Sequence, residues 1–263
     1  MSVSNKLILI TNDDGIGAKG IKKLIDVAMQ LGEVIVVAPA SPMSGMSHAI
    51  SVKDELGIAT YQNGYNISQY ICFGTPVDCI KIATTKILKR NPDIILSGIN
   101  HGLNSAASVF YSGTMAAALE GALKGIPSIA FSLDDFSPDA DFELSGKIAE
   151  KIITDIINNG LPEGIALNVN IPVTSFDKLN GIKIARQAKG YWQEKFIESK
   201  EDNEVKYYSV EGEFINLEPD ATDTDEWAIK NNYVSVVPVP VDLTSYVYFN
   251  ELKKRAIFNG KTF

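Results

Sequence analysis

The chain has 263 residues, of which 45% are hydrophobic and 21% are charged, and its formal net charge is −8. This composition supports a large buried core, and α/β folds of this length often form one domain. The acidic balance argues against duplex nucleic-acid binding, which relies on basic side chains, and the apolar runs are far shorter than the ~20 residues of a membrane-spanning helix.

Short β-branched runs alternate with longer helical patterns in the first half of the sequence, which is typical of a parallel sheet covered by helices. For example, Ile21, Leu24 and Ala28 recur at the spacing of one helix face. The predicted strands in this half are residues 7–11, 34–37, 93–97 and 126–131. The predicted helices are residues 18–31, 75–88, 113–124 and 142–158. Residues 48–74 are predicted to form a meander of shorter strands.

The second half of the sequence has a different character. Residues 181–216 alternate like antiparallel ribbons and carry several aromatic side chains. Such an arm either packs on a partner subunit or forms a plain surface hairpin, and the pattern alone favours neither. The other predicted elements are strands at residues 166–171 and 233–238, a short helix at residues 223–231 and a terminal helix at residues 245–257.

The cysteine content indicates a reducing compartment. Cys72 and Cys79 are the only two cysteines, and they lie seven positions apart without a CxxC spacing or a histidine cluster. Two reduced, buried thiols are typical of a cytoplasmic protein. The sequence therefore predicts a cytoplasmic location.

The strongest single feature is the NDDG segment at residues 12–15, directly after the first predicted strand. In open parallel sheets, ligands bind at the carboxyl ends of strands where the strand order reverses. Asp13 and Asp14 would repel each other there, and a hard divalent cation such as Mg²⁺ or Mn²⁺ removes this conflict. The plainer interpretation is that these residues cap the next helix. We predict a metal site, because two consecutive acidic residues after an apolar strand are uncommon for a cap.

Two other interpretations of this region are disfavoured. Residues 15–20 fit the pattern G-x-G-x-x-G between a strand and a helix, as in dinucleotide-binding proteins. However, the second predicted strand ends without the acidic residue that binds ribose, and the adjacent aspartates would repel a pyrophosphate. A covalent aspartyl-phosphate is disfavoured because no acidic residue lies two positions after Asp13.

Two further polar loops follow predicted strands and would meet the NDDG turn at the same edge of the sheet. Ser44 and His48 follow the second strand and offer a hydroxyl and a titratable ring. Asn100 and Asn104 follow the predicted strand at residues 93–97 and offer amide groups, and a helix then begins after Ser112, where backbone N–H groups favour phosphate. Without a G-x-S-x-G elbow or a Cys–His pair, metal-assisted hydrolysis is the chemistry that remains.

Taken together, these motifs resemble the survival protein SurE family of nucleotidases. The matching segments are ITNDDG at residues 10–15, VAP at 37–39 with SG at 44–45, GTP at 74–76, SGIN at 97–100 with Asn104, YSGT at 111–114 with AAA at 116–118, TDTD at 222–225, YVS at 233–235 and Pro238. The match spans nearly the whole chain. Gly17 is a departure, because many members are expected to carry a larger residue there.

The resemblance implies a fold: a three-layer α/β/α sandwich with a Rossmann-like, mostly parallel sheet, plus a C-terminal β-hairpin extension and tail. The resemblance also implies that residues 1–263 form one domain. The implied core covers residues 1–180 and 232–245, the hairpin and oligomerisation extension covers residues 181–231, and the C-terminal helix covers residues 245–257, with boundaries that are approximate. The extension and tail imply a homodimer or homotetramer.

The resemblance also implies an activity. The substrates are nucleoside 5′-monophosphates, together with 3′-monophosphates and short polyphosphate in some members. One divalent ion per subunit is expected, Mg²⁺ or Mn²⁺, with Ca²⁺ as a substitute in crystals. The implied metal ligands are Asp13, Asp14, Ser44 and Asn100. The implied phosphate contacts are Asn104, Ser112, Gly113 and Thr114, with Gly45 beside them.

The mechanism that we expect is in-line attack of water on phosphorus. Asp13 or Asp14 would act as metal ligand and general base, and Asn104 would help to hold the phosphate oxygens beside the helix start at Ser112. His48 is a candidate proton donor. The main alternative is a non-catalytic nucleotide sensor on the same fold, and a dinucleotide-dependent oxidoreductase is a more distant one.

Overall fold

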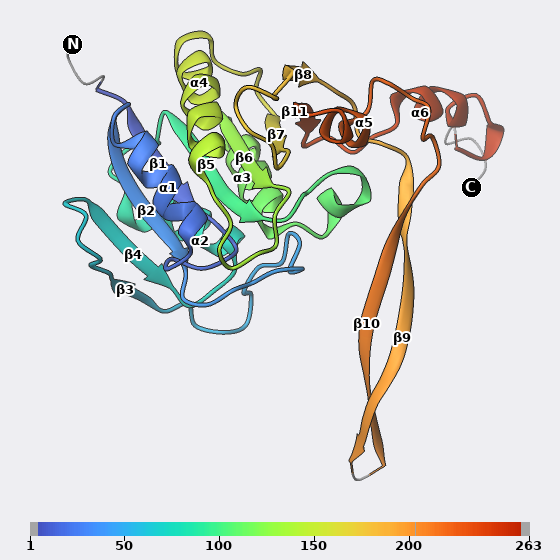
Figure 1. The fold of residues 1–263 in the computed structure, drawn as a ribbon, viewed down its shortest axis with the longest axis horizontal. Coiled ribbons are helices and arrows are strands. Elements are labelled where there is room, and N and C mark those ends of the chain that lie inside the picture. The colour runs from blue at the N-terminus through green and yellow to red at the C-terminus, as the bar shows by residue number, and fades with distance from the viewer. Residues whose placement is uncertain (1–4, 203, 259–263) are drawn as a thin grey trace.

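A computed structural model describes residues 5–202 and 204–258. The strands of its central sheet are β1 (Leu7–Thr11), β2 (Glu33–Pro39), β3 (Ile58–Thr60), β4 (Ser68–Cys72), β5 (Ile94–His101), β6 (Ser128–Leu133), β7 (Ile165–Ile171), β8 (Gly181–Ile184) and β11 (Tyr233–Pro240). Within the described residues these nine strands lie in the order β3-β4-β2-β1-β5-β6-β7-β11-β8 (Figure 1). A separate ribbon consists of β9 (Gly190–Asp202) and β10 (Val205–Asn216).

The sheet is mostly parallel. Its middle strands, from β4 through β2, β1, β5 and β6 to β7, all pair in parallel. The antiparallel pairs are β3 with β4 at one edge and β11 with β7 near the other. The α/β fold predicted from the alternation of strands and helices is confirmed.

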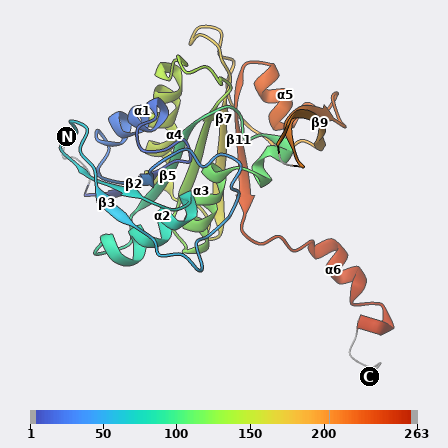
Figure 2. The same cartoon turned by 90° about the horizontal axis from the view of Figure 1, so that it is seen from below.

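Helices cover both faces of the sheet. The α-helices are α1 (Lys19–Ala28), α2 (Pro76–Ile82), α3 (Gly113–Leu123), α4 (Glu143–Asn159), α5 (Asp225–Lys230) and α6 (Tyr246–Leu252). The shorter helical segments are the π-helix η1 (Ala83–Ile87) and the 3₁₀-helices η2 (Ala106–Phe110) and η3 (Ala256–Phe258). Helices α1 and α4 pack together on one face, and α2 and α3 pack together on the opposite face (Figure 2). This gives the predicted three layers.

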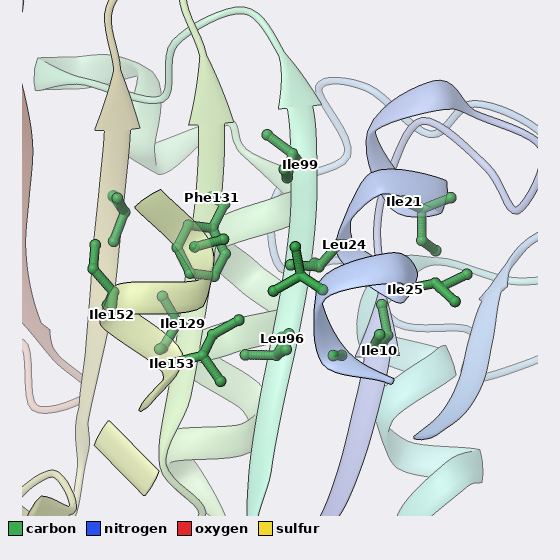
Figure 3. Close-up of a cluster of buried hydrophobic side chains, with 14 of the residues drawn as sticks. Ile10, Ile21, Leu24, Ile25, Leu96, Ile99, Ile129, Phe131, Ile152 and Ile153 are labelled. Carbon is green, nitrogen blue, oxygen red and sulfur yellow. The ribbon is translucent and has the colours of Figure 1, made fainter. Parts of the chain in front are cut away.

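The alternation of side chains along β1 explains how both layers are attached. Ile8 and Ile10 belong to the larger cluster, which contains the apolar stripes of α1 and α4. Figure 3 shows part of this cluster, including Ile10. Leu9 points the other way, into a cluster with Cys79 and Ile80 of α2. Because both faces of β1 are buried, residues 7–10 form a continuous apolar run, and Thr11 at the end of the strand is its one polar residue.

The order of the strands creates a crevice at the carboxyl ends of β1 and β5. From β1 the chain moves to β2 and β4 on one side, and then crosses to β5 on the other side of β1. Loops after β1 and β5 therefore leave the sheet in opposite directions, which opens a ligand site at this point in folds of this kind. The NDDG turn follows β1 at that crevice.

Two predicted segments differ from the structure. Residues 48–74 contain only β3 and β4 as strands, and part of the remainder is a loop held by Asp78, which accepts hydrogen bonds from the Ser51 N–H (3.1 Å) and hydroxyl (2.8 Å). The predicted helix over residues 75–88 is divided into α2 and the wider turn η1. Thr84 and Thr85 donate their hydroxyls to backbone carbonyls one turn earlier, and such bonds compete with regular helix geometry.

The second half also departs from the prediction in detail. The ribbon of β9 and β10 projects away from the body of the molecule (Figure 1). Strand β8, which the alternation groups with the ribbon, instead extends the central sheet beside β11 in parallel. The terminal helix is shorter than predicted, and none of the residues of α6 is buried, consistent with its position away from the body (Figure 2). Among the described residues, no helix is long and apolar enough to cross a membrane.

We predict that Gly20→Ala destabilises the protein, because a Cβ atom there would lie 1.9 Å from the carbonyl oxygen of Ile99 in β5. Overpacking of this kind costs about 1–3 kcal/mol, so the melting temperature should fall by about 2–12 °C. Gly17→Ala is the matched control, since nothing lies within 4 Å of a Cβ at that position. Thermal melts followed by circular dichroism measure both, and equal melting temperatures for the two variants would contradict this packing.

Candidate active site

Asp13 and Asp14 leave the end of β1 and are held by two different elements. Asp13 is buried and accepts a hydrogen bond from the hydroxyl of Thr114 in α3. Asp14 is half-buried and accepts a hydrogen bond from the backbone N–H of His101 at the end of β5, at 3.1 Å. The two carboxylates are therefore fixed where β1, β5 and the start of α3 meet.

Burial makes the charged form of both carboxylates unfavourable. It raises the pKa of Asp13 to about 6 against the opposing hydrogen bond from Thr114, and the charge of Asp14 adds to the rise. Burial also raises the pKa of Asp14, although the His101 N–H opposes the shift. No Lys or Arg lines the adjoining pocket in the described part of the chain. The site thus holds negative charge that no neighbouring Lys or Arg offsets.

A pocket of about 470 Å³ opens beside the aspartates, and residues from the loops after β2 and β5 line it. The backbone N–H of Met43 donates to the carbonyl oxygen of Asp13 at 2.7 Å, which draws the exposed Ser44 to the pocket. Asn100 donates its Nδ2 to the carbonyl oxygens of residues 101 and 102, at 3.0 and 2.8 Å. Its Oδ1 is therefore the amide atom left for a ligand.

The donor set of this pocket fits a hard divalent cation. It combines two carboxylates with an amide oxygen and a hydroxyl, and oxygen ligands are those that Mg²⁺ and Mn²⁺ prefer. The described residues contain no cluster of three or more His, Cys, Asp or Glu side chains that could hold a metal. Asp13, Asp14, Ser44 and Asn100 are the residues that could hold the ion.

Asn104 is positioned by a network that the sequence prediction does not include. Its backbone N–H donates to Oδ1 of Asn170 at 2.8 Å, and its carbonyl oxygen accepts from Nδ2 of Asn168 at 2.7 Å. Its own Nδ2 donates to the hydroxyl of Ser132 at 2.8 Å. Asn168 and Asn170 occupy alternate positions of the buried strand β7, and such polar residues in an otherwise apolar strand are the sequence signal that identifies them.

The predicted phosphate contacts fall into two groups, those that line the pocket and those that lie against Asp13. Ser112 lines the pocket and caps the helix by accepting the Met115 N–H at 2.9 Å, and Gly45 lines the pocket as well. Thr114 is fully buried and is engaged with Asp13. Gly113 lies against Asp13, since a Cβ atom at residue 113 would come within 2.9 Å of the Asp13 Cβ.

His48 lies apart from this pocket. Its Nε2 is 3.5 Å from a carboxylate oxygen of Glu120, in the middle of α3, and Glu120 also pairs with Lys81 at 2.9 Å. His48 is not among the residues that line the pocket beside Asp13 and Asp14. A role for His48 in proton donation stays a prediction that this geometry does not support.

The glycine-rich stretch at residues 15–20 forms a turn into α1 and does not offer a backbone cradle for a pyrophosphate. The N–H of Ile16 donates to the carbonyl oxygen of Pro39 at 3.0 Å, and the N–H of Ala18 donates to that of Gly15 at 3.1 Å. Asn12 Nδ2 closes the turn on the Gly15 carbonyl at 2.9 Å. The backbone N–H groups of Ile16 and Ala18 are therefore already engaged within the protein and are not free for a pyrophosphate.

Fold and site together define a class of protein: a three-layer α/β/α protein with an acidic, oxygen-rich pocket where the strand order reverses. Comparison with known proteins narrows this class. The sequence model of the family described as survival protein SurE matches residues 8–194. The chain belongs to the SurE family, as its motifs predict.

Relatives and a solved structure agree along almost the full length. A protein named 5′-nucleotidase SurE from Christiangramia forsetii is 49% identical over 254 residues, which cover 96% of this chain and 97% of that protein. A protein of the same name from Flavobacterium psychrophilum is 48% identical over 245 residues, or 93% and 95% of the two chains. The crystal structure of the SurE protein from Aquifex aeolicus has a TM-score of 0.80 at 36% identity and covers 94% of this chain and 98% of that one.

We predict that Mg²⁺ or Mn²⁺ raises the melting temperature, because a cation in the pocket relieves the repulsion between Asp13 and Asp14. At about 100 times its dissociation constant, a ligand stabilises the folded state by about 2.7 kcal/mol, or about 5–10 °C for a chain of this size. EDTA should reverse the rise, and Asp14→Asn should abolish it. A shift of the same size in Asp14→Asn would place the cation elsewhere.

Proposed function

We propose that this chain is a divalent-metal-dependent phosphomonoesterase that hydrolyses nucleoside 5′-monophosphates to a nucleoside and phosphate. The observation that carries the proposal is the pairing of Asp13 with Asp14 in a pocket whose described lining contains no Lys or Arg. A phosphate dianion cannot approach two carboxylates unless a cation offsets their charge. The name 5′-nucleotidase SurE carried by relatives that are nearly half identical supports the substrate class.

The cation ligands that we propose are Asp13, Asp14, Ser44 and Asn100. When bound, one Mg²⁺ or Mn²⁺ ion supplies positive charge next to the phosphate and lowers the pKa of a neighbouring water molecule. The carboxylates provide the charge that holds the ion. Ser44 Oγ and Asn100 Oδ1 complete the set as neutral ligands, which keeps the total charge of the site low enough for an anionic substrate.

The same carboxylates take part in the chemical step. Asp14 is the more exposed of the two and accepts a proton from the water that attacks phosphorus in line with the leaving oxygen. Asp13 accepts a hydrogen bond from the Thr114 hydroxyl and is better suited to be a rigid metal ligand. Asp13 could act as the general base only if this hydrogen bond breaks. The bond between phosphorus and the 5′ oxygen breaks, and this oxygen leaves as the nucleoside hydroxyl after it takes up the proton that Asp14 accepted or a proton from solvent.

The phosphate oxygens are held on the other side of the pocket. Asn104 uses one N–H of its Nδ2 on Ser132, which leaves the second N–H for the phosphate. Ser112 accepts the Met115 N–H, so its own hydroxyl hydrogen is free to donate. The positive end of the α3 dipole adds to these bonds. Nucleoside 3′-monophosphates and short polyphosphate present the same terminal group, and we propose them as further substrates.

We also propose that the chain assembles as a homodimer or homotetramer in the cytoplasm. The ribbon exposes aromatic side chains such as Phe196 and Tyr208, and α6 buries none of its residues within this chain. Cys72 and Cys79 are both free and buried, which suits a reducing compartment. Light scattering should give two or four times the mass of one chain, and a single-chain mass would refute the assembly.

We predict phosphate release from 5′-mononucleotides with Mg²⁺ or Mn²⁺ and no release with EDTA. Asp14→Asn should reduce turnover by at least about 10²–10³-fold, which is the usual loss when a group that stabilises developing charge is removed. Phe176→Ala, at an exposed position outside the pocket, should keep wild-type turnover. Tight nucleotide binding without phosphate release under either metal would identify the chain as a nucleotide sensor and would refute the enzymatic proposal.

A further inference from the structure

In the described part of the chain, Tyr111, Phe136 and Trp192 are exposed aromatic side chains that line the metal pocket, and the proposed hydrolysis uses none of them. Phe136 follows β6 and is 79% exposed, and Trp192 lies near the base of β9 and is 37% exposed. Both line the same pocket as Asp13 and Asp14. Large apolar surfaces beside a polar pocket are typical of sites that bind a ligand with one charged end and one flat, apolar end.

Trp192 is held in one orientation. Its Nε1 donates to the hydroxyl of Ser108 in η2 at 3.1 Å, and its ring meets Phe214 of β10 edge to face, with centroids 6.2 Å apart. The base of the ribbon is itself anchored to the loop after β5, because Asp225 accepts the N–H groups of Ala106 (2.8 Å) and Ala188 (2.9 Å). The ribbon therefore contributes a fixed indole to the pocket of its own chain.

Phe136 occupies space that is open because residue 102 is a glycine. A Cβ atom at Gly102 would lie 2.1 Å from Cε1 of Phe136, so the ring occupies the space that a larger residue would fill. Gly102 also has a φ of +91°, a conformation that other residues rarely adopt. Gly102 lies two residues after Asn100, and its carbonyl oxygen accepts a hydrogen bond from Asn100 Nδ2 at 2.8 Å, so Phe136 is tied closely to the metal site.

We propose that Phe136 and Trp192 form the nucleobase-binding part of the pocket, an inference that rests on the proposed nucleotidase function. With the phosphate held near Asp13 and Asn104, the base of the same molecule reaches the mouth of the pocket and stacks on the two aromatic rings. Stacking is available to every base because each has a flat π face. The site therefore accepts all nucleoside 5′-monophosphates and favours purines, which offer the larger face.

The first test compares two substrates that differ only in the base. With Mg²⁺, Phe136→Ala and Trp192→Ala should each lower kcat/KM for AMP by about 5- to 100-fold and leave kcat/KM for ribose 5-phosphate within about twofold. Trp192→Phe should retain most of the activity on AMP, because it keeps an aromatic face. Phe176→Ala is the control, an exposed phenylalanine beside Lys147 that lies outside the pocket.

The outcomes separate the two proposals. Equal losses on AMP and ribose 5-phosphate would mean that the rings only support the loops, and unchanged kinetics in both variants would mean that the base lies elsewhere. Either result overturns the nucleobase assignment while leaving the nucleotidase intact. If the wild-type chain releases phosphate from neither substrate, the proposed function fails, and the second test below still decides whether the rings bind a base.

The second test does not depend on turnover. The chain has two tryptophans, so Trp227→Phe leaves Trp192 as the single reporter. In the presence of Mg²⁺, a phosphonate analogue of AMP should quench the fluorescence of this variant, and ribose 5-phosphate should not. The Phe136→Ala change in the same background should weaken binding of the analogue by about 5- to 100-fold. Absence of quenching at saturation would overturn the assignment of Trp192.

Discussion

The repulsion between Asp13 and Asp14 is the constraint on which the rest of the site depends. Two neighbouring carboxylates are held at the end of a buried strand, and burial raises the pKa of both. Such an arrangement is unfavourable when no cation is bound, and proteins tolerate it where function requires it. The described pocket lining offers no Lys or Arg to offset the charge, so a bound cation is the simplest means of stabilising it, and a bound cation in turn attracts a phosphate.

The fold supplies this arrangement through the order of its strands. Because β2 and β5 flank β1 on opposite sides, the loops after these three strands converge and bring Ser44 and Asn100 to the aspartates. The start of α3 lies against Asp13, and the asparagines of β7 hold Asn104 from the far side of β6. The ribbon of β9 and β10 adds Trp192, so a segment predicted for oligomerisation also reaches the pocket of its own chain.

Much of this could be predicted from the sequence, and the reasons are local. Continuous apolar runs such as residues 7–11 identify buried parallel strands, and polar loops after them identify the edge where ligands bind. What could not be predicted depends on tertiary contacts. The pairing of β8 with β11, the engagement of Thr114 with Asp13 and the support of Asn104 by Asn168 and Asn170 all join residues that are distant in the chain, and no spacing rule reveals them. His48 likewise follows a strand as a site residue would, but it pairs with Glu120 outside the pocket.

We propose that the carboxylate pair makes anion binding conditional on a divalent cation. Calorimetric titration of inorganic phosphate into the metal-free chain, and into the chain saturated with Mg²⁺ or Mn²⁺, measures this coupling directly. We predict that phosphate binds at least about tenfold more tightly with the cation, and that phosphate raises the affinity for the cation by the same factor. Equal phosphate affinity with and without the cation would contradict it.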